Sequence, residues 1–424
     1  MPTHHERVAR LLARLTAHMA PEEWPELAAP LDEDPSPRNP QMRQITPALL
    51  DLRWQHVGAS DEVRAELLDK HTIDQQERYA KNIENFIGTV KLPVGIAGPL
   101  RMRGLHARGD YFVPMATTEA ALVASCTRGC AAASDCGGVM CAVVSEMVSR
   151  SPCFCFDSLI SAGRFVAWCA EHVADIRNAA QATTRHGKLD DLRFMLEGSN
   201  AFMSFDYFTA DAAGQNMVTI ATQAACEWIV AKSSVKPTRW YIEANHSSDK
   251  KASSQSLMGT RGKKVIAEVL LDEPTLRRRL HVSAQQMHDY WTTSTVGALL
   301  SGTVGVQGHT ANALAAAYIA TGQDAACVAE SAVGITRLEE RDATSLYASL
   351  TLPNLIVGTV GGGTGLPSQR ACLELLGFAG PGHANALAEV IAALALAGEL
   401  SIVAALASDE FTEAHRSLAR DRTP

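Results

Sequence analysis

The chain has 424 residues, more than one ordinary hydrophobic core holds, which predicts two or three domains. Its 46% hydrophobic and 20% charged residues are typical of a globular protein in water. The net charge of −8 argues against nucleic-acid binding as the main function, although a local basic pocket for an anionic cofactor is compatible with it.

The first part of the chain is predicted to be helical. Residues 1–30 have a helical pattern, and the Pro- and charge-rich stretch 31–41 interrupts it. Residues 4–20 are amphipathic and basic but lack the long apolar stretch of a signal peptide, so we expect a plain helix there. Residues 46–82 are charged and amphipathic, and we expect them to close a small helical region with no membrane domain ahead of it.

The composition changes at residue 84, where Gly, Pro and β-branched residues predict a strand and tight turns. Residues 117–148 predict a buried helix followed by a strand. Between 153 and 241, helices and strands alternate, with one helix beginning near Asn216, which fits an inserted small α+β domain. Small-residue helices and Gly-rich turns are then expected from 243 to about 408, within one large domain.

Residues 384–407 come nearest to a membrane span, but Asn385, Glu389 and Glu399 interrupt the apolar run. Their Ala- and Leu-rich composition suits a helix buried among other elements, so we expect no membrane partner.

The ten cysteines include no CxxC pair, and their closest spacings, Cys126/Cys130 and Cys153/Cys155, match no zinc pattern. A chain of this size does not need disulfides for stability. We therefore expect reduced structural thiols, a cytoplasmic location and no bound metal.

Three ionisable residues lie in apolar or small-residue settings: Glu119 in PMATTEAALVAS, Lys250 in SSDKKASS and Asp324 in YIATGQDAACVAE. His415, in TEAHRSLAR, joins them near the C-terminus. Charged residues are seldom buried unless they are paired, so we interpret the set as one coupled proton-transfer site. The alternative for each residue alone is a salt-bridged or solvated side chain.

The chain contains no G-x-G-x-x-G fingerprint of a Rossmann domain. The nearest run, GTVGGGTG at 358–365, has the wrong spacing, but its glycines allow close backbone approach to a ligand. A structural tight turn is an equally good interpretation of this run.

Seven segments occur in the order and approximate spacing of the 3-hydroxy-3-methylglutaryl-CoA reductase family, which the chain resembles from about residue 80 to 420. They are ENFIGTVKLPVGIAGPL (84–100), TTEAALVASCTRGC (117–130), DAAGQNM (211–217), DKK (249–251), GQDAA (322–326), IVGTVGGGTGL (356–366) and LAGELSIVAALA (396–407). The resemblance implies an α+β fold. Its expected parts are a helical N-terminal region (1–82), a large helix-rich substrate domain (83–152 and 242–408), an inserted ferredoxin-like cofactor domain (153–241) and a C-terminal catalytic arm (409–424).

The resemblance also implies an NADPH-dependent, four-electron reduction of an acyl thioester to an alcohol, by default 3-hydroxy-3-methylglutaryl-CoA to mevalonate. The Lys250 amine is a compact charge suited to a developing oxyanion. Glu119 supplies a proton to the alkoxide, with its pKa raised by burial or by a neighbouring Asp324. His415 protonates the leaving CoA thiolate.

Binding roles are implied by the same resemblance. They are Arg150, Asp249 and Lys251 for the acyl group, His309 and Asn312 for the CoA and reaction site, and Arg164, Phe165, Asp211 and Asn216 for the cofactor. The Arg164 guanidinium suits a 2′-phosphate, which favours NADPH over NADH. The ENFIG segment matches a dimer interface, and we expect a homodimer or higher homo-oligomer with shared active sites.

The chain departs from the family at several positions. Glu243 and Thr293 stand where a serine and a lysine usually hold the acyl carboxylate, Ala131 and Ala414 replace an arginine and a serine, and Asp421 stands where some eukaryotic members have a phosphorylatable serine. A carboxylate facing a carboxylate is destabilised. One alternative is therefore a reductase of another CoA- or carrier-protein-bound acyl thioester, and another is a non-catalytic homologue.

Overall fold

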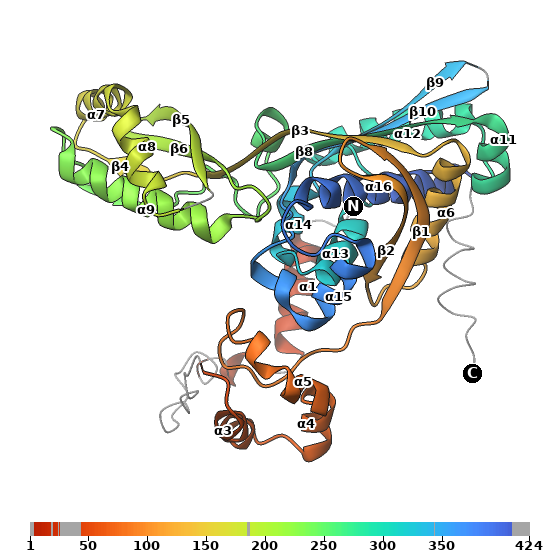
Figure 1. The fold of residues 1–424 in the computed structure, drawn as a ribbon, viewed down its shortest axis with the longest axis horizontal. Helices are drawn as coiled ribbons and strands as arrows, with labels where there is room; N and C mark the ends of the chain where they lie inside the picture. Colours follow the sequence, from red (N-terminus) through yellow and green to blue (C-terminus); the bar gives the residue numbers. More distant parts are fainter. Residues whose placement is uncertain are drawn as a thin grey trace.

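A computed structural model describes residues 4–17, 20–23, 25, 44–184, 187–342 and 344–408 (Figure 1). Its buried apolar side chains form three clusters, one in the N-terminal helical region, one in a small domain and one in a large domain. Helices and antiparallel strands are mixed throughout the larger two, so the expected α+β class is confirmed.

The N-terminal region consists of short helices. They are α1 (His4–Thr16), the 3-10 turn η1 (Pro21–Glu23), α3 (Pro47–Val57), α4 (Asp61–Leu67), α5 (Lys70–Asp74) and η2 (Gln76–Arg78). Thr46, Ser60 and Asp69 begin α3, α4 and α5, because each side chain accepts a backbone N–H from the first turn.

The cluster of this region reaches past the expected boundary at residue 82. Phe86 is 2% exposed, and its ring stacks on Tyr79 with centroids 5.0 Å apart. Trp54 also donates its indole N–H to the Ile87 carbonyl at 3.0 Å. These contacts hold the ENFIG segment against the N-terminal helices, although its composition resembles that of the strand that follows.

The small domain is formed by β4 (Cys153–Cys155), α7 (Leu159–Glu171), α8 (Val173–Gln181), β5 (Lys188–Glu197), β6 (Asn200–Phe208), α9 (Gln215–Lys232) and β7 (Arg239–Tyr241). Its strands pair in the antiparallel order β7-β4-β6-β5. This is the ferredoxin-like arrangement expected from the sequence. Alternate residues of β6, such as Met203 and Phe205, are fully buried in the cluster that includes residues of the helices.

The large domain has the remaining elements. They are β1 (Val94–Gly104), β2 (Arg108–Ala116), α6 (Leu122–Asp135), β3 (Val139–Arg150), α10 (Gln255–Met258), β8 (Gly262–Asp272), α11 (Glu273–Thr275), η3 (Leu276–Leu280), α12 (Ala284–Ser301), α13 (Thr310–Thr321), η4 (Ala325–Cys327), α14 (Val328–Ser331), β9 (Ile335–Asp342), β10 (Ser345–Leu355), η5 (Gly362–Gly365), α15 (Pro367–Leu376) and α16 (Ala384–Ala407). The three long strands β8, β9 and β10 correct the prediction of helices and turns after 243. Short apolar runs such as those in β8 and β10 cannot be distinguished from buried helix by periodicity.

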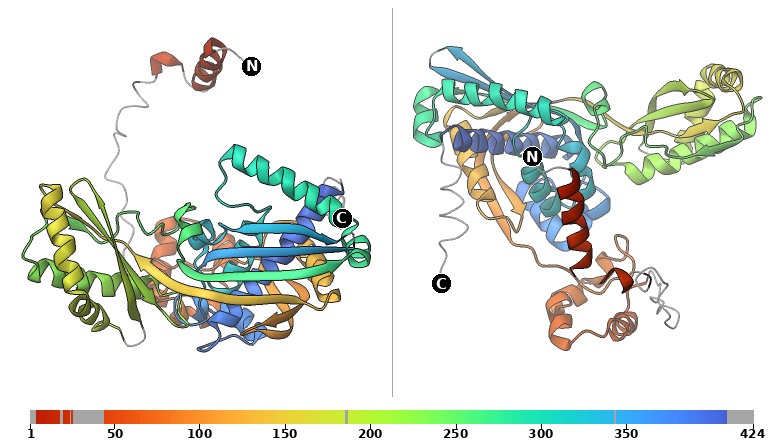
Figure 2. Two further views of the ribbon diagram at one scale, coloured as in Figure 1. Left: turned by 90° about the horizontal axis from the view of Figure 1, so that it is seen from above. Right: turned by 180° about the vertical axis from the view of Figure 1, so that it is seen from behind.

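One strand joins the two domains. The first part of β3 pairs with β1 and β8 of the large domain, and its last residues, Val148 to Arg150, pair with β6 of the small domain. Figure 2 shows β3 running from one domain into the other. This continuity places Arg150 at the junction.

Helix α16 lies at the centre of the large domain and is long and apolar enough to cross a membrane, but 83% of its apolar window is buried inside the protein. The expected buried helix is therefore observed. The carboxylate of Glu389 accepts three backbone N–H groups from residues 105–107. The carboxylate of Glu399 accepts the backbone N–H groups of Gly308 and His309 and two threonine hydroxyls. Both buried charges are thus satisfied by hydrogen bonds.

Candidate active site

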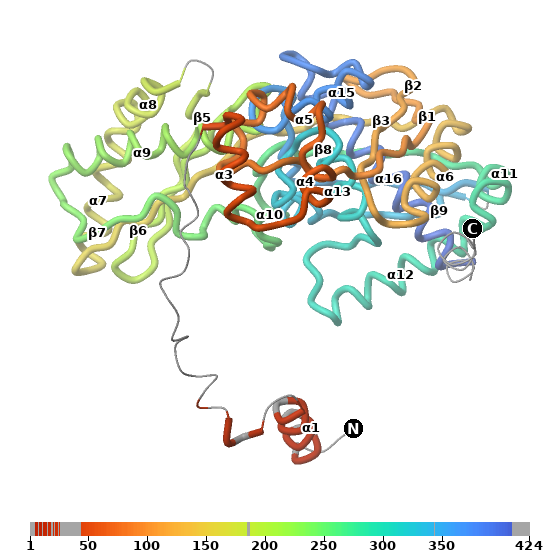
Figure 3. The backbone as a smooth tube through the Cα atoms, turned by 90° about the horizontal axis from the view of Figure 1, so that it is seen from below, coloured from red at the N-terminus to blue at the C-terminus, as the bar shows by residue number. Residues whose placement is uncertain are grey.

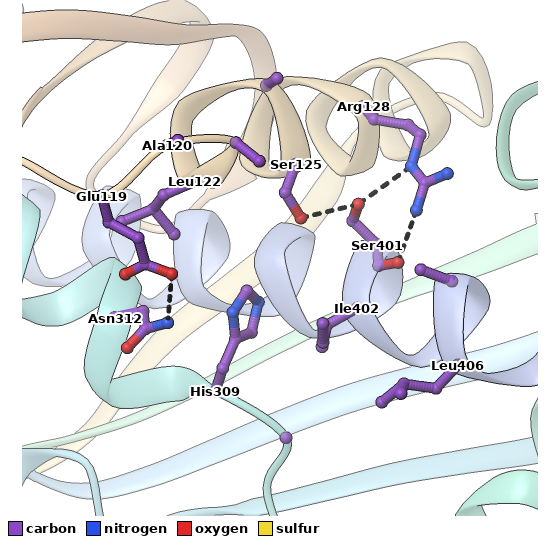
Figure 4. Close-up of a pocket in the computed structure, with 14 residues that line it drawn as sticks. Glu119, Ala120, Leu122, Ser125, Arg128, His309, Asn312, Ser401, Ile402 and Leu406 are labelled. Atoms are coloured by element: carbon purple, nitrogen blue, oxygen red, sulfur yellow. Dashed lines mark hydrogen bonds between the residues drawn. The ribbon is translucent and has the colours of Figure 1, made fainter. Parts of the chain in front are cut away.

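Glu119 lies at a cavity of 410 Å³ between α6, α13 and α16 (Figure 4). Its carboxylate is exposed in the single chain and accepts a hydrogen bond from the Asn312 amide at 3.3 Å. Ala121, which precedes α6, has a left-handed φ of 70°, so the Glu119 segment turns sharply into the helix. The His309 ring lies in the same cavity and donates from Nε2 to the Gly398 carbonyl at 2.9 Å.

The opposite wall of this cavity has residues that the sequence analysis did not assign. Ser125 on α6 hydrogen-bonds Ser401 on α16 at 2.9 Å, and Arg128 donates to the Ser401 carbonyl at 2.7 Å. Leu122 and Ile402 provide apolar surface beside them. An apolar wall next to hydroxyl and guanidinium groups suits a long flexible chain that carries amides and a charged end.

Lys250 and Asp324 form the second part of the candidate site. The Lys250 ammonium lies 2.8 Å from the Asp324 carboxylate, and both side chains are 41% exposed. The hydrogen bond that the Lys250 ammonium donates to Asp324 raises the pKa of Lys250 above its usual value, with burial opposing the rise. The ammonium is therefore charged at neutral pH and held in a fixed direction.

A network of charges lies beside Lys250. The Arg150 side chain is 9% exposed and donates to the carboxylates of Asp249 at 2.9 Å and Glu243 at 3.4 Å. Burial alone would raise the pKa of Asp249, but Arg261 and Arg150 more than offset it and the pKa is lowered. Glu243 also accepts the Ser247 hydroxyl at 2.9 Å, while its Oε1 atom is buried without a hydrogen-bond partner.

The two parts of the site are separated within one chain. Asn312, which contacts Glu119, lies in the first turn of α13, and Asp324 follows the end of this helix. A 12-residue helix is about 18 Å long. The structure therefore brings Lys250 to Asp324 as expected, but Glu119 and Asp324 of the same chain do not form the expected carboxylate pair.

The four residues expected to bind the cofactor have different environments in the structure. Asn216, at the start of α9, lines a groove of 660 Å³ together with Asp324 and the glycine-rich turn at 358–363. Asp211 uses its carboxylate to accept backbone N–H groups of Gly382 and Ala384, so it holds the segment before α16. Arg164 is exposed on α7.

Phe165 requires a correction. Its side chain has no exposed surface, and its ring packs against Phe154 and Phe156 at centroid distances of 4.8 and 4.9 Å. The Phe165 side chain is therefore part of the small-domain core and not a cofactor contact. Its neighbour Arg164 points outward because adjacent helical residues lie on different faces.

A cavity of 650 Å³ shares Asn216 and the glycine-rich turn with the groove and adds basic residues that the sequence analysis missed. Arg78 and Lys81 come from the N-terminal region, and Arg370 comes from α15. The Arg78 guanidinium donates to the Gly365 carbonyl at 2.9 Å. No local motif marks these side chains, because folding alone brings them together.

Lys251 and His415 are the remaining residues expected in the site. The exposed Lys251 ammonium donates to the Asp249 carbonyl at 2.8 Å, so it closes its own turn. His415, Ala414, Asp421 and the arm 409–424 lie outside the described residues.

Comparison with known proteins shows extensive similarity. A family model for hydroxymethylglutaryl-coenzyme A reductase matches residues 50–420. A 3-hydroxy-3-methylglutaryl-coenzyme A reductase of Methanocaldococcus jannaschii is 40% identical over 355 residues, 82% of this chain and 87% of that protein. One of Aeropyrum pernix is 41% identical over 354 residues, covering 82% and 84%. A class II reductase structure from Streptococcus pneumoniae, bound to NADPH, has a TM-score of 0.63 at 19% identity, covering 86% of this chain and 98% of that chain.

Proposed function

Because the chain belongs to the hydroxymethylglutaryl-coenzyme A reductase family, we propose that it reduces 3-hydroxy-3-methylglutaryl-CoA to mevalonate with NADPH, in the cytoplasm. The reaction converts a thioester to an alcohol in two reductions. The observation that carries the proposal is the Lys250–Asp324 pair beside a groove large enough for a cofactor. A fixed ammonium there can stabilise the negative charge that develops on a carbonyl oxygen.

The groove fits a nicotinamide dinucleotide. Its 660 Å³ lies within the size range of small-molecule sites. The glycine-rich turn at 358–363 allows phosphates to approach its backbone, and Arg78, Lys81 and Arg370 supply positive charge in the adjoining cavity. We propose that Asn216, with Arg164 of the small domain, holds the cofactor, which supplies hydride when bound.

The chain's own residues then supply charge and protons. Lys250 donates a hydrogen bond to the carbonyl oxygen, while Asp324 keeps its ammonium in place. Glu119, oriented by Asn312, gives a proton to the alkoxide, and His415 gives one to the departing thiolate. Glu119 reaches this oxygen only from another subunit, because its own Asp324 lies at the far end of α13.

We infer that the protein is a homodimer in which each active site combines Glu119 of one subunit with Lys250 and Asp324 of the other. The separation of these groups within one chain supports this arrangement. So does α12, which projects from the body and exposes Leu299 and Leu300 at 80% and 83% (Figure 3). Apolar side chains gathered on a projecting helix are typical of a protein interface.

The substrate is held from both sides in this arrangement. The acyl group lies at Arg150, Asp249 and Lys251, and the CoA arm lies in the 410 Å³ cavity with His309 and Asn312. The apolar surface of Leu122, Ile402 and Leu406 suits the pantetheine chain, and Arg128 adds positive charge at the same cavity.

A second candidate function follows from Glu243. The Glu243 carboxylate already forms an ion pair with Arg150, and its buried Oε1 atom has no hydrogen-bond partner. A substrate carboxylate bound here would need hydrogen-bond donors, whereas Oε1 is an acceptor. This arrangement favours an acyl thioester with a neutral or cationic tail. The two functions differ in the tail and share the chemistry at Lys250.

Replacing Glu243 with Ser and Thr293 with Lys tests the tail pocket. If Glu243 repels the substrate carboxylate, the double variant should gain more than about tenfold in kcat/KM for 3-hydroxy-3-methylglutaryl-CoA, because one change removes a like charge and the other adds an opposite one. Steady-state kinetics with a neutral acyl-CoA serve as the matched control. Efficient turnover by the unmodified protein and no gain in the variant would exclude the second function.

Replacing Arg164 with Ala tests the cofactor assignment. We expect the KM for NADPH to rise several-fold while that for NADH changes little, because the guanidinium meets the 2′-phosphate alone. Arg177, which binds backbone carbonyls of residues 189 and 190 in the same domain, is the control position. A parallel change in both constants would remove Arg164 from this role.

The proposed function itself is tested by product stoichiometry. The purified protein should oxidise two NADPH for each mevalonate formed from 3-hydroxy-3-methylglutaryl-CoA. Oxidation with other acyl thioesters but not with this one would replace the first function with the second. Absence of NADPH oxidation with every thioester would contradict both.

A further inference from the structure

The loop that carries Lys250 has an unusual backbone. Asn245, Ser248 and Lys250 have φ angles of 62°, 61° and 58°. Residues other than glycine rarely adopt this left-handed conformation, which persists only where the surrounding structure enforces it. The contacts that fix this loop therefore determine where the Lys250 ammonium lies.

Glu330 holds the loop from inside the large domain. Its side chain has no exposed surface, and its Oε1 accepts the backbone N–H of Lys250 at 3.1 Å. Its Oε2 accepts a hydrogen bond from Arg261, whose side chain is 4% exposed. The second Arg261 nitrogen donates to Asp249 at 2.8 Å. Glu330 thus holds the backbone of Lys250, and Arg261 holds the carboxylate of the preceding residue, Asp249.

The segment that holds the Lys250 backbone also holds the partner of its ammonium. Asp324 precedes η4, and Glu330 lies in α14, which follows η4 directly. The Oδ1 atom of Asp324 accepts the Ala326 N–H at 3.1 Å, while Oδ2 contacts the Lys250 ammonium. One short segment therefore fixes both ends of Lys250.

We propose that Glu330, with Arg261 as its partner, is a positioning residue for the reaction at Lys250, an inference that rests on the function proposed above. Because Glu330 is fully buried, it contacts neither substrate nor cofactor. It acts by keeping the backbone conformation from which Lys250 reaches Asp324. A displacement of about 1 Å can lower a rate about 10²-fold, so a buried residue can control turnover in this way.

The first test is Glu330→Gln. The amide cannot accept hydrogen bonds from both Lys250 and Arg261 through two oxygens, so kcat should fall at least about tenfold with little change in the KM for NADPH. Glu389→Gln is the matched control, because Glu389 is also fully buried and accepts backbone N–H groups in another part of the domain. It should lower thermal stability without a comparable loss of kcat. Equal loss of kcat in both variants would overturn the inference.

A double-mutant cycle shows whether Glu330 acts through Lys250. In a Lys250→Ala background, Glu330→Gln should lower the residual rate less than about twofold, because effects that share one group are not additive. The same factor in both backgrounds would show that Glu330 acts elsewhere.

The pair Glu330→Leu with Arg261→Met removes the buried ion pair, which should recover stability but not kcat. Recovery of kcat together with stability would indicate a purely structural role.

Hydrogen exchange separates this inference from the proposed function. The backbone amides of residues 248–251 should exchange faster in Glu330→Gln than in the unmodified protein or Glu389→Gln, whatever the substrate. If the unmodified protein does not reduce 3-hydroxy-3-methylglutaryl-CoA, the proposed function fails while this measurement still decides the role of Glu330. Unchanged exchange would overturn the positioning role.

Discussion

Replacing Lys250 with Ala should lower kcat by at least about 10²–10³-fold, because loss of one preorganised oxyanion partner has this effect in known enzymes. The Lys250 ammonium is held 2.8 Å from Asp324, which raises its pKa and keeps it charged at neutral pH. No other cation is fixed by this carboxylate among the described residues. The rate of NADPH oxidation at saturating substrate measures the effect.

The fold and cofactor binding should survive this change, since the Lys250 side chain is 41% exposed. The thermal transition and the NADPH dissociation constant should therefore match those of the unmodified protein. Lys232→Ala, at the end of α9, is a control for the loss of one exposed lysine. Near-normal turnover by Lys250→Ala would show that another group stabilises the oxyanion.

Mixing inactive subunits should restore activity if the active sites are shared. Glu119→Ala and Lys250→Ala damage opposite sides of the proposed site, so a mixed dimer has one site with both residues intact. Random pairing of equal amounts should return about a quarter of the unmodified activity, from two parents that are nearly inactive. Differently tagged subunits, co-expressed and purified as heterodimers, should show about half of the unmodified activity, because one of their two sites is intact.

The control pair is Lys250→Ala with Asp324→Asn. These residues are in contact within one chain, so the two changes damage the same side and mixing should restore nothing. If the first pair restores activity and the control pair does not, each active site combines residues of two subunits. Failure of the first pair, with heterodimers shown to be present, would mean that each chain builds its site alone.

The sequence predicted the parts of this protein that local pattern determines. The helix–strand alternation between 153 and 241 became the ferredoxin-like domain, and the DKK and GQDAA segments met at the Lys250–Asp324 contact. The strands β8 and β10 were missed because their residue types do not alternate. In β8, for example, apolar Ile266 and Leu270 lie on the less buried face, so the sequence has no polar–apolar period to detect.

The site residues that the sequence missed depend on tertiary contacts. Glu330 lies in the short helix VAES, where a glutamate is ordinary, and only the fold brings Arg261 to it across 69 positions. Phe165 illustrates the opposite error, because its resemblance to a cofactor position gave no sign that its ring faces the core. The separation of Glu119 from Asp324 likewise depends on the length of α13, which cannot be predicted from the motifs alone.

Helix α16 affects the synthesis of this protein as well as its folded structure. It is the last described element of the large domain to be synthesised, and its buried side chains share one core with helices and strands from the rest of that domain, so the domain cannot complete this core before α16 has been made. Until then the emerging segment resembles a membrane anchor. A charged side chain at the centre of an inserting helix costs about 2.5–3.5 kcal/mol. Glu389 and Glu399 lie within this apolar run, so their charges add a cost to bilayer insertion until they bind their backbone partners.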